Sequence, residues 1–172
     1  VIEGTFGKEI NNREDFYRGL RLAELSGNIT DPEAFINDSY YGLYYNYGGN
    51  PMLHFNYIDT TKITNARYLF SGCTIDRIDL TNKKLGVIEG SAFGFMYKIN
   101  GLKEIILGEQ DFSNVDSLQV AFAYNPDLER VDASKINTSN SDSFVGTFGD
   151  NPKLKEIDIS SWTFKAGIGG SV

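Results

Sequence analysis

The chain repeats itself, and the period of the repeat constrains its fold more than any other feature. An Asn-Pro-x-Leu motif occurs three times, at residues 50–53, 125–128 and 151–154. Strand-like runs of pattern Leu-x-x-Ile-x-Leu begin at four positions that are 27, 26 and 26 residues apart: Ile75, Leu102, Leu128 and Leu154. A fixed period in this range predicts a solenoid, in which each unit buries its apolar face only against its neighbours.

Each repeat has three parts. The first is a strand, and because side chains alternate across a strand, Ile157 and Ile159 are expected to face the core while Glu156 and Asp158 face outward. The second is a turn rich in Ser, Thr and Asn, whose short side chains hydrogen-bond their own backbone. The third is a short helical or irregular return that inserts one aromatic ring into the core: Phe70, Phe93, Phe122 and Phe148.

The fold class predicted from these units is an α/β solenoid with a parallel β-sheet on one face and short helical or irregular returns on the other. Residues 51–164 are expected to hold the repeats with about five strands. The first fits 55–61, and its start is either Leu53, counted from the Asn-Pro motif, or Phe55, counted back from Thr61. Residues 1–50 are interpreted as an N-terminal cap, partly helical, because solenoids need atypical terminal units. Residues 165–172 are expected to form a flexible tail.

Composition excludes several classes of function. The formal net charge is −7, which argues against a nucleic-acid partner, because phosphate binding needs clustered Lys and Arg. The sequence has no apolar run of the length that a membrane span needs, so no membrane insertion is expected. The single Cys73 excludes an internal disulfide framework.

The repeats resemble a known family. Residues 128–140 read Leu-Glu-Arg-Val-Asp-Ala-Ser-Lys-Ile-Asn-Thr-Ser-Asn, Phe70-Ser-Gly-Cys73 supplies a Phe-x-x-Cys element, and 157–162 repeat the opening. This pattern is similar to the BspA-like leucine-rich repeats of bacterial surface proteins, of the Mycoplasma/Lactobacillus type. The resemblance covers about 55–164 and implies a leucine-rich-repeat solenoid displayed on the bacterial cell surface, with adhesion as a common role and no defined ligand.

Stacking the strands in register lines up their outward side chains in two columns on the sheet face. The first column alternates in sign from Arg77 on, as a ladder of ion pairs would: Tyr57, Arg77, Glu104, Arg130 and Glu156. The second is acidic except at one position: Asp59, Asp79, Ile106, Asp132 and Asp158. The acidic residues either brace the strand ends by bonding to the Ser or Thr two residues on, or contact a partner together with Tyr57 and Ile106; a metal is the least favoured reading.

Five tyrosines near the N-terminal cap form an alternative binding surface: Tyr40, Tyr41, Tyr44, Tyr45 and Tyr47. They either plug the cap or serve recognition, in which exposed Tyr is enriched. No catalytic residue, metal ligand or cofactor is expected. His54 has no partners spaced for zinc or catalysis, Cys73 fits a buried position, and Trp162 fits packing under the last repeat better than a carbohydrate platform.

Together these features predict a non-enzymatic, extracellular binding or adhesion module that recognises a protein or glycan on a host or neighbouring cell. The alternative is a structural or receptor-binding component of a phage virion, such as a tail fibre or baseplate. Self-association through residues 1–50 would favour that alternative. An enzyme such as a glycan hydrolase is disfavoured, because it needs two carboxylates at a fixed separation in a cleft.

Overall fold

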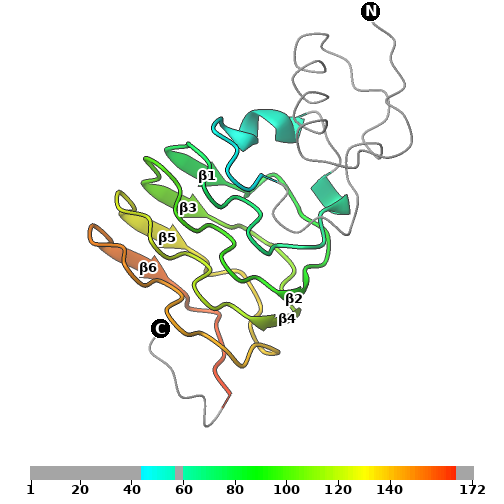
Figure 1. Cartoon of the computed structure of the whole chain (residues 1–172). Helices are drawn as coiled ribbons and strands as arrows, with labels where there is room; N and C mark the ends of the chain where they lie inside the picture. Colours follow the sequence, from blue (N-terminus) through cyan, green and yellow to red (C-terminus); the bar gives the residue numbers. More distant parts are fainter. Residues whose placement is uncertain (1–43, 57–59, 166–172) are drawn as a thin grey trace, which may run out of the picture.

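The computed structural model describes residues 44–56 and 60–165, which form a parallel β-solenoid of about three turns. Four strands make one sheet in the order β1-β3-β5-β6 (Figure 1): β1 (Arg77–Asp79), β3 (Glu104–Ile106), β5 (Arg130–Asp132) and β6 (Glu156–Asp158). All neighbours are parallel, and each residue pairs with the residue one repeat further along the chain. The predicted register is therefore confirmed from β1 to β6.

Alternation along the strands builds the sheet side of the core. Ile78, Ile105 and Val131 are the central residues of β1, β3 and β5, and all three are buried. Their neighbours on either side are partly or fully exposed, because successive side chains of a strand point to opposite faces. Ile157 holds the same position in β6 but is 44% exposed, since no described turn packs beyond it; its predicted core position is wrong.

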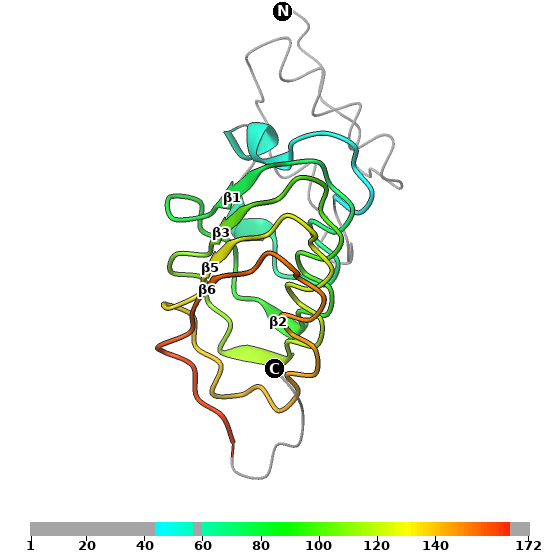
Figure 2. The ribbon, with the colours of Figure 1, turned by 90° about the vertical axis from the view of Figure 1, so that its left-hand side faces the viewer.

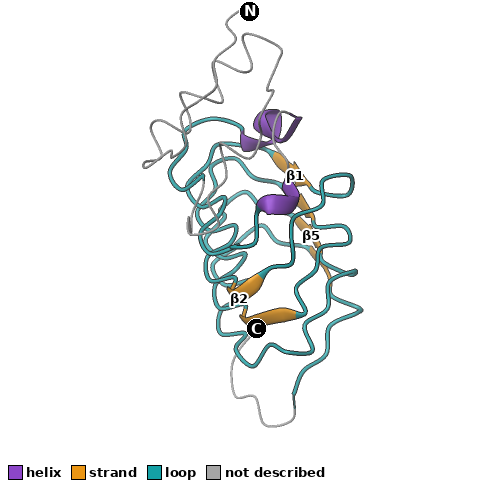
Figure 3. Cartoon of the chain, turned by 90° about the vertical axis from the view of Figure 1, so that its right-hand side faces the viewer, coloured by secondary structure: helices purple, strands orange, loops and turns teal. Residues whose placement is uncertain are grey.

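The returns are not helical, so the α part of the predicted class is wrong for the described residues. Only two 3-10 helices occur there, η2 (Pro51–Asn56) and η3 (Thr60–Lys62), and Figure 3 draws the other described residues as strand or loop. Successive returns bond to one another through the backbone. The Phe70 N–H donates to the Phe95 carbonyl at 3.0 Å, and the Phe122 N–H donates to the Thr147 carbonyl at 2.9 Å. These turn-to-turn bonds satisfy the backbone groups that a helix would have paired internally.

A left-handed backbone position recurs in each return and explains why a helix cannot form. Four residues at 26-residue spacing have a φ between 54° and 73°: Gly72, Lys98, Tyr124 and Asp150. A second such position lies four residues earlier in each turn, as at Tyr68 and Gly94. Two left-handed residues per return break any helix and turn the chain back toward the sheet (Figure 2).

A second, two-stranded parallel sheet lies apart from the main one, and the repeat analysis missed it. It pairs β2 (Glu89–Ser91) with β4 (Asn114–Ser117) in parallel. An isolated bridge between Ser117 and Ser143 carries the same pairing one turn further.

A column of phenylalanine rings fills the core between sheet and returns. Ring centroids are 5.7 Å apart between Phe70 and Phe95, 6.2 Å between Phe95 and Phe122, and 5.4 Å between Phe122 and Phe148. The column therefore contains Phe95 in place of the predicted Phe93, which is partly exposed. The sequence did not distinguish Phe93 from Phe95, because side chains in the returns do not follow the two-residue alternation of a strand.

The Asn-Pro corners at Asn125 and Asn151 are held by asparagine side chains that hydrogen-bond to the preceding turn. Asn125 is fully buried; its amide Nδ2 donates to the Met96 and Phe122 carbonyls at 2.9 and 3.1 Å, and its Oδ1 accepts the Ile99 N–H at 2.8 Å. Asn151 repeats this one turn later, accepting the Asn125 N–H at 2.8 Å. Each asparagine replaces backbone bonds that the chain cannot make as it turns the corner.

The N-terminal side differs most from expectation. The strand predicted over 55–61 is absent from its described part, where η2 and η3 lie instead, and His54 lies in η2 and not at a strand end. Residues 57–59, and with them Tyr57 and Asp59, lie outside the described residues, as do 1–43 and 166–172. The Tyr44 N–H donates to the Leu69 carbonyl and the Asn46 N–H to the Ser71 carbonyl, which makes 44–46 part of the first return.

Candidate interaction surfaces

The outward face of the main sheet brings together eight of the ten residues predicted there. The first column is Arg77, Glu104, Arg130 and Glu156, and the second is Asp79, Ile106, Asp132 and Asp158. We call this surface the sheet face. Its four strands pair in parallel and in register without a bulge.

The first column is a continuous ladder of ion pairs, as its alternating signs predicted. Glu104 accepts Arg77 Nε at 2.6 Å through one carboxylate oxygen and Arg130 Nη1 at 2.8 Å through the other. Arg130 Nε lies 3.3 Å from Glu156. These hydrogen bonds hold the pKa of the Glu104 carboxyl below its ordinary value, first through Arg77 and then through Arg130. Because the groups are exposed, each pair adds little stability, but together the pairs order the side chains of this column.

The aspartates of the second column brace the strand ends, so the structural reading of these residues is confirmed. Asp132 Oδ1 accepts the Ser134 hydroxyl at 2.7 Å and the Ser134 N–H at 3.2 Å. Asp79 Oδ1 accepts the Thr81 N–H, and Asp158 Oδ1 accepts the Ser160 N–H, each at 3.0 Å. The backbone N–H of Thr81 lowers the pKa of Asp79, and the Ser134 hydroxyl, followed by the Ser134 N–H, lowers that of Asp132.

Because these carboxyl groups have lowered pKa values, the free energy of unfolding depends on pH in the acid range. A carboxyl with a depressed pKa in the folded state contributes stability above its unfolded pKa, about 4, and loses that contribution as pH falls through the folded value. We expect the urea midpoint to be constant from pH 7 to about pH 5 and to fall below about pH 4. Urea unfolding at a series of pH values measures this.

Two variants test whether the loss of stability at acid pH comes from the aspartates that brace the strand ends. Asp132→Asn keeps the acceptor oxygen but removes the titration, so its urea midpoint should fall less steeply between pH 5 and pH 3 than that of the wild type. Asp142→Asn is the control, because the exposed Asp142 carboxylate makes no hydrogen bond within the described residues. Identical profiles for Asp132→Asn and wild type would contradict the role of the brace.

The sheet face keeps an excess of negative charge after its internal pairs are made. Two arginines stand against five carboxylates within it, which leaves a net −3: Arg77 and Arg130 against Asp79, Glu104, Asp132, Glu156 and Asp158. Half-buried Ile106 interrupts the acidic column with an apolar contact area. The sheet face therefore presents an acidic surface with one half-buried apolar residue, Ile106.

The structure describes three of the five tyrosines of the alternative surface, and the three lie in different environments. Tyr44 is fully buried against Phe55 and Phe70, so it is a core residue and unavailable to a partner. Tyr45 is exposed and packs edge-on against Tyr68 at 5.7 Å, while Tyr47 is half-buried. Tyr40 and Tyr41 lie outside the described residues.

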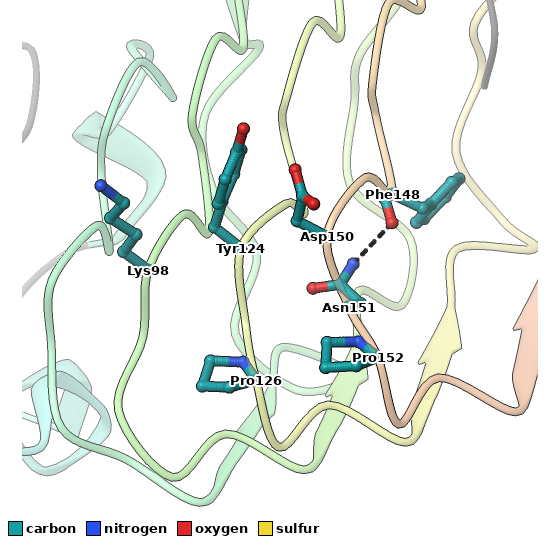
Figure 4. A pocket seen from close by; sticks show the side chains of 7 residues that line it. All are labelled: Lys98, Tyr124, Pro126, Phe148, Asp150, Asn151 and Pro152. Atoms are coloured by element: carbon teal, nitrogen blue, oxygen red, sulfur yellow. Dashed lines mark hydrogen bonds between the residues drawn. The ribbon is translucent and has the colours of Figure 1, made fainter.

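A shallow groove lies at the corner between returns and sheet, and none of its residues was predicted as a ligand contact (Figure 4). Its lining includes Lys98, Tyr124 and Asp150, which stand in one column one turn apart, and the rings of Pro126 and Pro152. The Tyr124 ring is 42% exposed, and Lys98 Nζ lies 5.7 Å from its centroid. The 26-residue spacing of Lys98, Tyr124 and Asp150 is the sequence pattern from which this groove could have been predicted.

The polar groups of this groove are largely engaged within the molecule. A hydrogen bond to Asp150 raises the pKa of the Tyr124 hydroxyl. Asn151 Nδ2 donates to the Phe122 and Phe148 carbonyls, both at 2.8 Å. The groove thus offers an apolar platform with few unsatisfied hydrogen-bonding groups, and it is the second candidate surface.

Other predicted assignments agree with the packing. Cys73 is buried, which raises the pKa of its thiol to about 12, and Trp162 is buried with its Nε1–H donating to the Ala133 carbonyl at 3.0 Å. Within residues 44–56 and 60–165, no group of three or more His, Cys, Asp or Glu side chains is placed to hold a metal ion. The same residues include no helix of the length and hydropathy needed to cross a bilayer.

No protein-family model matches the sequence, and neither the curated proteins nor the solved structures include a match to it. The chain is a solenoid repeat protein with turns of about 26 residues.

Proposed function

We propose that this chain is a non-enzymatic binding module that recognises a protein or glycan partner through the sheet face. The observation that carries the proposal is the excess of carboxylates on the sheet face, where ion pairs and hydrogen bonds to the strand ends order the side chains. Ordered charge of one sign steers and orients a partner of the opposite sign, and its preorganisation lowers the entropy cost of binding. The partner surface is therefore rich in Lys or Arg, or in hydrogen-bond donors.

We propose further that the chain is a leucine-rich repeat of the BspA-like type, displayed outside the cell on a bacterial surface. Support comes from the 26-residue turn, from the four-stranded parallel sheet of Leu-x-x-Ile-x-Leu strands, and from the buried Cys73 of the Phe-x-x-Cys element. Adhesion to a host or neighbouring cell is the role that fits an extended acidic face of this kind.

Binding of the full chain to protein and glycan arrays tests the proposal. We expect Asp79→Asn/Asp132→Asn to weaken binding at least about tenfold, because two of the five carboxylates lose their charge. Asparagine keeps the acceptor oxygen of each brace, so the fold should be retained, and circular dichroism checks this.

Two further variants locate the surface. Asp111→Asn is the matched control, since Asp111 Oδ1 makes the same bonds to Ser113 at 3.1 and 2.7 Å but lies outside the main sheet. It should bind like the wild type. Loss of binding in Tyr124→Ala, with Asp79→Asn/Asp132→Asn unaffected, would move the site to the groove and contradict the proposal for the sheet face.

A further inference from the structure

Hydrogen bonds restrain most of the described asparagines of this solenoid. One group bonds to the backbone through the side-chain amide: Asn50, Asn65, Asn125, Asn137 and Asn151. In a second group, the N–H of the next residue donates to a backbone carbonyl: Asn46, Asn82, Asn114 and Asn140. In both groups, a bond holds either the side-chain amide or the N–H that follows it, so the two cannot easily meet.

Asn100 is the exception among the described asparagine side chains. It is exposed, and its side-chain amide makes no hydrogen bond with a described residue. Gly101 follows it, in the only Asn-Gly pair of the sequence, and the Gly101 N–H has no partner within 44–56 and 60–165. Gly101 is exposed, and no atom lies within 4 Å of the position that a Cβ would take there. The Gly101 nitrogen can therefore approach the Asn100 side chain.

We propose that Asn100 is a deamidation site, at which water replaces the side-chain amide in two steps. In the first step, the Gly101 backbone nitrogen forms a bond to Cγ of Asn100, and the amide nitrogen leaves as ammonia with the proton of that N–H. The product is a five-membered succinimide ring. In the second step, water adds to one of the two ring carbonyls and opens the ring to aspartate or isoaspartate. Water is the only co-reactant, and the first step is intramolecular, which favours it.

The modified residue lies where two turns of the main sheet join. Asn100 forms a bridge with Thr74; its N–H donates to the Cys73 carbonyl at 2.9 Å, and its carbonyl accepts the Ile75 N–H at 3.2 Å. In isoaspartate the main chain runs through the side-chain carbons and is one methylene longer. The carbonyl that bonded to Ile75 then becomes a carboxylate outside the main chain, so the join between the two turns loosens.

Ageing of the full chain in mildly alkaline buffer tests the proposal. Peptide mapping by mass spectrometry follows each asparagine, and electron-transfer fragmentation distinguishes isoaspartate from aspartate. Asn100 should convert at least about tenfold faster than Asn140, which is also exposed but precedes an N–H that is bonded to the Thr138 carbonyl. Equal rates at the two residues, or no conversion of Asn100, would overturn the proposal.

The same chain unfolded in urea separates the effect of the fold from that of the sequence. Asn140 should convert faster there than in the folded protein, because its protecting bond is lost. The rates of Asn100 in the two states should agree within about tenfold. A larger slowing of Asn100 in the folded protein would show that the fold protects it, which contradicts the proposal.

Gly101→Asp tests the attacking group. Asp tolerates the positive φ of 74° at this position, and its side chain has room, so the fold should be retained, with circular dichroism as the check. Its Cβ hinders the approach of the residue 101 nitrogen, so conversion of Asn100 should slow at least about tenfold. An unchanged rate would exclude the succinimide route.

Asn100→Asp separates the added charge from the longer main chain. This variant should unfold at the same urea concentration as the fresh protein, whereas the isoaspartate form, separated by chromatography, should unfold at a lower one. An isoaspartate form as stable as the fresh protein, or an equal loss in Asn100→Asp, contradicts the loosened join. None of these measurements depends on a partner, so their failure would leave the proposed binding at the sheet face untouched.

Discussion

Asn125→Ala lowers the free energy of unfolding by about 2–5 kcal/mol, because it leaves two buried backbone groups without partners at about 1–3 kcal/mol each. These groups are the Ile99 N–H and the Met96 carbonyl, which the Asn125 amide joins across one turn, while the Phe122 carbonyl keeps its hydrogen bond from Asn151 Nδ2. Alanine offers neither a donor nor an acceptor, and water cannot replace the amide without opening the corner. Urea unfolding at pH 7 measures the loss.

The control for this variant is an exposed asparagine in a similar local bond. Asn137 Oδ1 accepts the Ser139 N–H at 2.9 Å, but the pair is exposed, so water replaces the bond. Asn137→Ala should therefore cost less than about 1 kcal/mol. Equal losses in Asn125→Ala and Asn137→Ala would show that the buried amide does not hold the turns together.

Phe95→Ala is expected to cost about 3–5 kcal/mol, the range for a large-to-small change at a buried aromatic residue. Phe95 is fully buried and its ring contacts those of Phe70, Phe112 and Phe122, with centroids 5.7, 5.7 and 6.2 Å away. Its removal opens a cavity at the middle of the phenylalanine column, where the stacked turns have little freedom to collapse.

Phe93→Ala is the matched comparison, since the same substitution is made two residues away. Phe93 is partly exposed and packs edge-on against Tyr68 at 5.3 Å. The loss of this contact should cost about 1 kcal/mol. Thermal and urea unfolding of the two variants distinguish them, and a larger loss for Phe93→Ala than for Phe95→Ala would mean that the column is assigned to the wrong rings.

The strand register and the paired columns followed from the sequence because both depend on simple periods. A two-residue alternation within each strand and a 26-residue repeat between strands place Glu104 between Arg77 and Arg130. The Asp–x–Ser brace at Asp132 was likewise readable, since it is a local bond between residues two apart.

The returns and the two ends were less predictable for physical reasons. Left-handed residues such as Lys98 and Tyr124 interrupt any regular period, so the choice between Phe93 and Phe95 and the absence of helices could not be read from the pattern. Ile157 follows the strand pattern fully, yet burial depends on a neighbouring turn, which the pattern within one repeat does not specify. The sheet of β2 and β4 pairs short segments with little apolar alternation.

The groove and the tyrosines show the same limit for the candidate sites. Lys98, Tyr124 and Asp150 share a column, but that they line a groove depends on how the returns turn at each left-handed residue. Tyr44 falls in the tyrosine-rich segment by sequence and in the core by structure, because its backbone joins the ladder of returns.

The stacking of 26-residue turns in register is the central claim, and disulfide cross-linking tests it most directly. Arg77 and Glu104 are partners across β1 and β3, so Arg77→Cys/Glu104→Cys should close an intramolecular disulfide on mild oxidation, detected by mass spectrometry. Buried Cys73, with its raised thiol pKa, should stay reduced. Arg77→Cys/Ile106→Cys, out of register by two residues and about 8 Å apart, should not close. A disulfide in the second variant and none in the first would contradict the register and, with it, the surfaces built on that register.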